Sequence, residues 1–249
     1  MPANVNPVDD SQFFVRQHYR DFLNREPDPS GLAFWTQEIE QCGADAQCRE
    51  VKRINVSAAF FLSIEFQDTG FLVERIYRLA FGINVSYRDF VYDARKVGEG
   101  VVVGRGDWRA RLDANRRAYA EEFAARPPFR EEFPDDLTPP QYVERLNTKA
   151  TGALSPAEFT ALVTGLENGT ETRGSALLKV ADDEDFRRRE FNRGFVLMQY
   201  LGYLRRDPDE GGFNFWLSKL DQFNGNYIQA EMVKAFISST EYRQRFGAP

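Results

Sequence analysis

Hydrophobic positions along this chain recur mainly with the spacing of α-helices. In SQFFVRQHYRDFLN, residues 11–24, the apolar side chains fall on one helical face. Further helix starts occur at Thr138 and Ser155, each followed by proline and then by Gln or Glu at the third helical position. The glycine-rich stretch EGVVVGRGDW, residues 99–108, lacks the strand–turn–helix context of a nucleotide-binding loop, and we interpret it as a connection. The pattern predicts an all-α fold.

The stretch REPDPSGLAFW, residues 25–35, has the features of a tight joint between two helices. Pro27 ends the preceding helix, because proline lacks a backbone N–H and restricts the residue before it. Asp28 is placed to cap the next helix, with proline at its first position. Gly31 lets the two backbones approach closely. We therefore expect a capped helix–helix joint.

The sequence motif of the joint occurs a second time near the other end of the chain, as RRDPDEGGFNFW at 205–216. Asp209, Gly212 and Trp216 repeat the first copy at an offset of 181 residues, so that Trp216 corresponds to Trp35. Two copies of so specific a phrase indicate an internal repeat. We expect both copies to have the same backbone, with the two tryptophans buried in equivalent positions.

A second match follows each joint. AFFLSIEFQ, residues 59–67, corresponds to AFISSTEYR, residues 235–243, at an offset of 176 residues. The first copy therefore carries five more residues between its two matching stretches, and QCGADAQC at 41–48 is the natural place for them.

Two weaker copies lie in the middle of the chain. In the copy at 71–133, FLVERIYRLAFG at 71–82 is similar to the first helix. Trp108 then precedes EFAARPPFREEF at 122–133, which is similar to the closing stretch. The copy at 139–190 keeps only the caps and the helical spacing. This alignment places all three tryptophans at equivalent positions. We expect one helical domain over 1–249, built of helix–joint–helix repeats at 12–67, 71–133, 139–190 and 190–247.

The joint and the closing stretch together resemble a bacterial domain of unknown function, numbered 4214. The resemblance rests on FVRQHYRDFLNREPDPSGLAFW, followed by AFFLSIEF, and it is closest in the first copy. In the last copy, Leu201 replaces the Arg that follows Tyr, and Phe213 replaces Leu. The resemblance implies small helical units attached to secreted or surface proteins, similar in shape to the linker domains of light-harvesting rods. It implies no catalytic residues.

Charge and composition narrow the classes of partner. The net charge is −6, and the longest basic run, RRR at 187–189, is flanked by acids, which argues against binding to nucleic acid. No stretch approaches 18 uncharged apolar residues, so we expect no membrane span. Residues 1–13 lack the features of a signal peptide. Three interpretations follow: the signal peptide has been removed, the chain is an excised piece of a longer protein, or the protein is cytosolic.

Cys42 and Cys48 are the only cysteines, and both lie in the extra segment of the first copy. Structural zinc takes four ligands, and the spacing is not that of a Cys-x-x-Cys redox motif. A local disulfide is the best interpretation. Because disulfides persist outside the cytosol, it favours a secreted or cell-surface protein whose signal peptide is absent from this chain.

Calcium is the alternative to a simple cap at each joint. EPDPSG at 26–31 and DPDEGG at 207–212 place oxygen-bearing side chains as an EF-hand loop does. The bidentate Glu that closes such a loop is missing, because its position holds Gln37 in one copy and Ser218 in the other. We favour the cap and predict no metal or cofactor.

Candidate catalytic groups are few. His18 is the only histidine and lies on the apolar face of the first helix, as a half-buried packing residue would. The acid pairs at 135–136 and 182–183 are interpreted as helix N-terminal charges, although two such carboxylates could serve a hydrolase. We predict a non-catalytic interaction or scaffold module with a protein or glycan partner. The alternatives are a cell-envelope carbohydrate-binding module and a carboxylate-based hydrolase.

Overall fold

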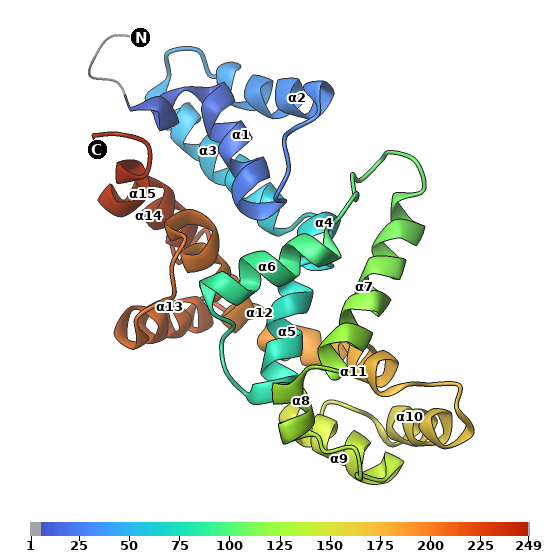
Figure 1. The fold of residues 1–249 in the computed structure, drawn as a ribbon. Coiled ribbons are helices and arrows are strands. Elements are labelled where there is room, and N and C mark those ends of the chain that lie inside the picture. The colour runs from blue at the N-terminus through green and yellow to red at the C-terminus, as the bar shows by residue number, and fades with distance from the viewer. Residues whose placement is uncertain (1–5, 249) are drawn as a thin grey trace. The chain divides into compact units, whose positions relative to one another are not determined.

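The chain is a series of α-helices joined by short connections (Figure 1). The computed structural model describes residues 6–248, and within them no β-strand is present. The expected all-α fold is therefore confirmed. The stretch at 99–108 is a connection between two helices, as predicted, with Trp108 as the first residue of the second helix.

Contacts within the chain define two compact units, where the sequence led us to expect a single domain over 1–249. Unit 1 combines the described residues up to Gln67 with those from Phe195 onward, and unit 2 is Asp68–Gly194. Unit 1 contains η1 (Pro7–Asp9), α1 (Ser11–Phe22), α2 (Pro29–Glu40), α3 (Ala46–Phe61), α4 (Ile64–Gln67), the π-helical turn η2 (Gln199–Leu204), α13 (Glu210–Gln222), α14 (Met232–Ser238) and α15 (Thr240–Gln244).

Unit 2 holds the middle of the chain. Its helices are α5 (Gly70–Phe81), α6 (Tyr87–Val97), α7 (Trp108–Ala124), α8 (Pro127–Glu132), α9 (Pro139–Lys149), α10 (Pro156–Asn168) and α11 (Arg173–Ala181). The helix α12 (Glu184–Met198) begins in unit 2 and ends in unit 1.

Each of four successive segments shows the same order of local features. A first helix ends near a residue with left-handed backbone, and four positions later a capping residue starts the second helix. The left-handed residues are Asn24, Gly82, Thr151 and Arg205, with φ of 51°, 72°, 56° and 52°. The caps are Asp28, Ser86, Ser155 and Asp209, and each accepts a hydrogen bond from the backbone N–H three residues on.

The end of each segment is also shared. A third helix is followed by a further helix whose third residue is a fully buried aromatic side chain. This further helix is short in three of the segments, whereas in the third segment it is the 15-residue α12. These aromatic residues are Phe66, Phe129, Phe186 and Tyr242. The same buried ring in four places anchors the end of each segment to its own core.

The two outer segments, which we call repeat 1 and repeat 4, pack against each other in unit 1. They meet through the same helices, with α1 against η2 and α3 against α14. Phe22 and its counterpart Tyr203 contact each other, with ring centroids 5.2 Å apart. Contact between counterparts is what an approximate two-fold axis produces. Gly202 permits this approach, because a Cβ atom there would overlap the ring of Phe22.

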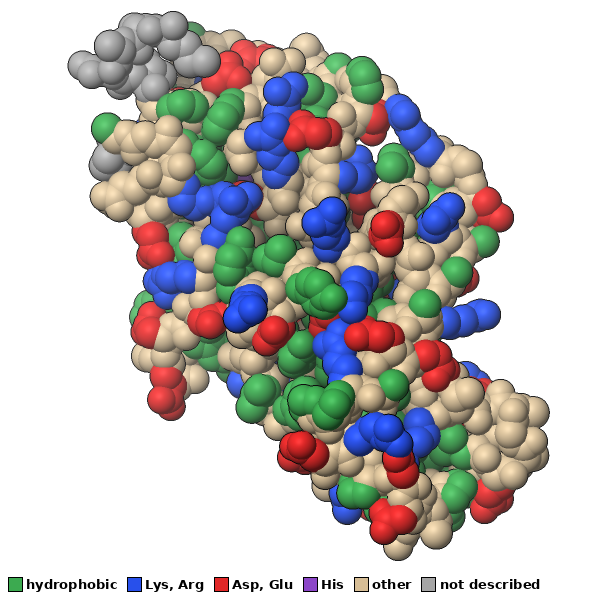
Figure 2. Space-filling view, viewed as in Figure 1, with side chains coloured by type: hydrophobic (Ala, Val, Ile, Leu, Met, Phe, Trp, Pro, Cys, Tyr) green, Lys and Arg blue, Asp and Glu red, His purple; other side chains and the backbone are tan. Residues whose placement is uncertain are grey.

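The exposed surface mixes both signs of charge. Figure 2 shows basic and acidic side chains interspersed over the visible face. Within residues 6–248, no single helix has the length and apolar composition to cross a membrane. One bent pair, Ala46–Phe61 with Ile64–Phe81, passes that test when the two are taken together.

Candidate functional site

The two predicted joints have the expected local structure. Asp28 accepts a hydrogen bond from the Gly31 N–H at 3.0 Å, and Asp209 accepts one from the Gly212 N–H at 2.7 Å. A Cβ atom on either glycine would collide with a tyrosine hydroxyl of the preceding helix. The predicted caps are therefore confirmed. At Gly31 the close neighbour is the side-chain hydroxyl of Tyr19 rather than a second backbone.

That tyrosine places the first helix against the joint in both repeats. Tyr19 packs edge-on against Phe60 at 4.9 Å, and Tyr200 packs in the same way against Phe236 at 5.0 Å. The hydroxyl of each tyrosine lies over the glycine of its own joint. The tyrosine thus fills the space that the missing glycine side chain leaves.

An ion pair that the sequence analysis missed closes each joint. Arg25 binds Glu65 through two hydrogen bonds of 2.8 and 2.9 Å, and Arg206 binds Glu241 at 2.5 and 3.1 Å. We call these two pairs the Arg–Glu clamps. Each clamp connects the joint to the short helix that ends the repeat. The signal was present, because both arginines and both glutamates keep the offsets of their own stretches.

The joint tryptophans occupy equivalent places but are less buried than expected. Trp35 packs on Phe60 with centroids 6.0 Å apart, and Trp216 packs on Phe236 at 5.6 Å. Both tryptophans are half-buried. The reason is their position at the outer edge of the second helix, where one ring face meets the core and the other faces outward.

Beside each tryptophan lies an exposed phenylalanine. Phe34 is 57% exposed and Phe215 is 58% exposed, and each ring meets its neighbouring tryptophan edge-on, at 4.9 and 5.1 Å. The two phenylalanines are counterparts in the repeat. The structure therefore presents the same aromatic pair twice on its surface.

Trp108 is not equivalent to the other two tryptophans, so that part of the sequence alignment is wrong. Counted from the cap of each joint, the place of Trp35 is taken in the second segment by Asp93 of α6. Trp108 instead begins α7 and is buried there. The alignment was wrong because Trp35 and Trp216 lie in the second helix of their repeats, whereas Trp108 starts the third helix of its segment.

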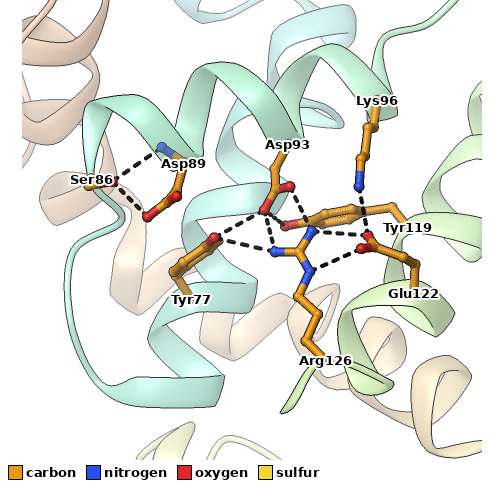
Figure 3. A network of polar contacts seen from close by, with 8 residues as sticks. All are labelled: Tyr77, Ser86, Asp89, Asp93, Lys96, Tyr119, Glu122 and Arg126. Atoms are coloured by element: carbon orange, nitrogen blue, oxygen red, sulfur yellow. Dashed lines mark hydrogen bonds and ion pairs between the residues drawn. The ribbon is translucent and has the colours of Figure 1, made fainter. Parts of the chain in front are cut away.

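The buried Asp93 is the centre of a polar network in unit 2 (Figure 3). Arg126 donates two hydrogen bonds to its carboxylate, at 2.8 and 2.7 Å, and the hydroxyls of Tyr77 and Tyr119 donate two more, at 3.1 and 3.0 Å. Burial, with the Asp93 charge beside it, raises the pKa of each tyrosine. Glu122 holds the other side of Arg126 at 2.9 Å. This closed set of donors and acceptors stands where the outer repeats have a tryptophan.

His18 is more deeply buried than the sequence suggested, at 1% exposure. Its Nδ1–H donates to the Phe14 carbonyl at 2.8 Å, so Nε2 accepts from the Ser57 hydroxyl at 2.5 Å. Burial lowers the pKa of His18 to about 3, which keeps the ring neutral. The predicted role as a packing residue is consistent with these contacts.

The acidic residues at 135–136 and 182–183 differ in their contacts. Asp183 caps α12 through the Phe186 N–H at 2.9 Å, as a helix N-terminal charge should. Asp182 instead pairs with Arg116 and with the buried Arg75, which corrects our interpretation of that residue. Asp135 pairs with Arg130.

The cysteines are joined as expected. Cys42 and Cys48 form a disulfide that ties the turn after α2 to the first turn of α3. Among the residues that the structure describes, no group of three or more His, Cys, Asp or Glu side chains is arranged to hold a metal ion.

A comparison with protein families fits this geometry. A family model described as "Domain of unknown function (DUF4214)" matches residues 5–70 and 183–246, which together make up just over half of the chain. The chain belongs to the DUF4214 family. Searches of curated proteins and of solved structures each give no match.

The two DUF4214 matches coincide with repeats 1 and 4 and leave out the middle of the chain. Only the outer repeats have the tryptophan and the Arg–Glu clamp. In the second segment, the positions that correspond to the clamp hold Ile83 and Pro128, and Asp93 stands at the position of the tryptophan. The matched regions are therefore those that carry these joint residues.

Proposed function

We propose that this chain is a non-catalytic interaction or scaffold module, and that its contact surfaces are the outward faces of α2 and α13. The observation that carries this proposal is the matched exposure of Phe34 and Phe215. An exposed aromatic side chain costs solubility and adds nothing to the core, so its presence at both equivalent positions favours a role in contact with a partner.

The chemistry around Phe215 suits recognition. Gly211, Asn214, Ser218 and Gln222 surround the ring along a shallow groove of about 650 Å³, together with Lys219. The Lys219 ammonium lies 5.2 Å from the centre of the Trp216 ring. An apolar ring among amide and hydroxyl groups can bury surface and also form directed hydrogen bonds.

Two equivalent surfaces suggest bivalent binding. α2 and α13 occupy corresponding places in repeats 1 and 4 and lie on different sides of unit 1 in Figure 1. The two faces share the Phe–Trp pair but not all of its neighbours, because Ala33 and Glu38 of α2 stand where α13 has Asn214 and Lys219. A module with two such faces can hold two places on a repetitive partner and gains avidity by doing so. This arrangement favours a scaffold role.

His18, Asp93 and the two candidate calcium ligands are engaged in hydrogen bonds within the fold, which supports a non-catalytic role. The His18 ring is neutral and uses both nitrogens in hydrogen bonds within the core. Asp93 is held by Arg126 and two tyrosines. Asp28 and Asp209, the candidate calcium ligands, are engaged in caps.

The proposed compartment is outside the cytosol, in a secreted or surface-attached bacterial protein. The Cys42–Cys48 disulfide supports this, because such bonds persist in oxidising surroundings. Binding of a cell-envelope carbohydrate is the second candidate function. The amide and hydroxyl side chains around Phe215 favour it, since a sugar ring stacks on an aromatic face and bonds to groups beside it.

Binding to the envelope fraction of the source organism tests the proposal. The wild-type chain is compared with Phe34→Ala, Phe215→Ala and the double variant. Ile83→Ala is the control, because Ile83 is 55% exposed in the connection between α5 and α6. We expect each single variant to lose avidity and the double variant to lose binding, while the control binds as the wild type does.

Two treatments of the fraction separate the candidates. Protease digestion should abolish binding if the partner is a protein, and periodate oxidation should abolish it if the partner is a glycan. Unchanged binding by the double variant would refute the proposed surfaces.

A further inference from the structure

A pocket of about 340 Å³ lies in unit 1 where repeats 1 and 4 meet, between α3 and α14. No residue of α2 or α13 lines it, so it is separate from the faces described above. Its charged lining consists of four cations and two acids: Arg49, Arg53, Lys234, Arg243, Asp9 and Glu50. The lining thus has an excess of positive charge in a chain whose net charge is −6.

Three of the four cations have acidic partners. Arg243 binds Asp9 through two bonds of 2.7 and 2.8 Å, and Lys234 binds Glu50 at 3.2 Å. Both of these pairs connect repeat 4 to the N-terminal part of the chain. Arg49 is paired outside the lining, with Glu40 of α2 at 2.9 Å.

Arg53 is different. Within residues 6–248, no carboxylate lies within ion-pair distance of its guanidinium. One Nη2–H donates to the Val8 carbonyl at 2.8 Å, and the guanidinium covers the Phe14 ring with its carbon 3.8 Å from the centroid. Arginine carries five N–H donors in a planar fork, so this single bond leaves most of the fork for another acceptor.

The surroundings of Arg53 favour an anion. Burial is the main cause that lowers the pKa of Arg53. The charge of Asp9 acts in the opposite direction, and the charges of Arg243 and Arg49 lower the pKa because each disfavours an additional cation. The negative charge of Asp9 is already shared with Arg243. A desolvated guanidinium without a counter-charge gains more from an incoming anion than an exposed one does.

We propose that this pocket binds a small molecule through an oxyanion group, which the fork of Arg53 receives and the ammonium of Lys234 helps to neutralise. Arginine suits this task because its planar donors match the geometry of phosphate and carboxylate oxygens. The volume fits a small molecule rather than a chain, and Ala46 and Ile237 provide apolar wall beside the charges. The ligand would contact both repeats at once.

Inorganic phosphate is the probe, titrated into the full chain in a calorimeter at constant ionic strength, with chloride as the balancing ion. We expect Arg53→Met to weaken phosphate binding at least tenfold, because it keeps the apolar stem and removes the fork. Lys234→Met should weaken binding about threefold to tenfold. Arg88→Met is the matched control, because Arg88 is an exposed arginine of α6 outside the pocket, and it should bind as the wild type does.

Arg53→Lys keeps the charge without the fork and guards against a folding defect in the methionine variant. It should bind phosphate more weakly than the wild type but more tightly than Arg53→Met. The proposal is overturned if phosphate gives no more heat than chloride. It is also overturned if the Arg53 and Lys234 variants all bind as the wild type does.

Discussion

Glu74 is a side chain from which we expect a large dependence of stability on pH. It lies on α5 with 0% exposure, and neither carboxyl oxygen has a hydrogen-bond partner among the residues described. Gly194 and the Phe71 ring lie against it. Burial, with the charge of Glu190 as a second cause, raises the pKa of Glu74 from 4.5 to about 8. The nearby arginines at positions 75, 78 and 193 act in the opposite direction without cancelling this rise.

The sign of the effect follows from proton binding. Between pH 4.5 and about 8 the folded chain keeps a proton on Glu74 that the unfolded chain has lost. The free energy of unfolding therefore decreases as pH rises through this interval and levels off above it. At about 1.4 kcal/mol per tenfold change in proton affinity, the full interval corresponds to an upper limit of about 5 kcal/mol.

Glu74→Gln tests this reasoning, since the amide resembles the neutral carboxyl and does not titrate. Urea unfolding is measured from pH 5 to pH 9 for the wild type, for Glu74→Gln and for Glu144→Gln, an exposed control on α9. We expect the wild type and Glu74→Gln to agree near pH 5. Above pH 8 the variant should be more stable by several kcal/mol, while the control follows the wild type. Parallel curves for all three proteins over the whole range would refute a buried neutral Glu74.

Three further predictions concern the packing of unit 1. Arg25→Met should cost about 3 kcal/mol in urea unfolding, because the Arg25–Glu65 side chains are only 19% and 7% exposed and Glu65 would be left without its cation. Arg206→Met should lower the free energy of unfolding by less than about 1 kcal/mol, since the Arg206 and Glu241 side chains are 40% and 48% exposed. Equal losses for the two variants would contradict the argument from burial. Gly202→Ala should cost about 1–3 kcal/mol by forcing the first helices of repeats 1 and 4 apart, and an unchanged melting temperature would show that they can separate freely. Reduction of the Cys42–Cys48 bond should cost about 2 kcal/mol, because a loop closed over so few residues loses little entropy; two free thiols in protein from an oxidising compartment would contradict both the bond and the proposed location.

The sequence by itself determined the features that depend on neighbouring residues. Helical spacing predicts the fold class, and the order Pro-Asp-x-x-Gly predicts the caps. A cap is a bond between residues three positions apart, and a left-handed turn depends on a few backbone angles. Such features need no knowledge of the rest of the chain. The disulfide could be predicted for the same reason, since its two cysteines are six positions apart.

The tertiary structure decided which distant surfaces meet. The two clamps join residues 40 and 35 positions apart, and Asp93 meets Arg126 at a separation of 33. Helical spacing marks a face as buried but does not say which other face covers it. For that reason the pairing of repeats 1 and 4, the substitution of an acid for a tryptophan, and the displaced position of Trp108 appear only in the folded chain. The half-exposed aromatic pairs on α2 and α13 have the same origin, because the core covers one side of each ring and leaves the other side free.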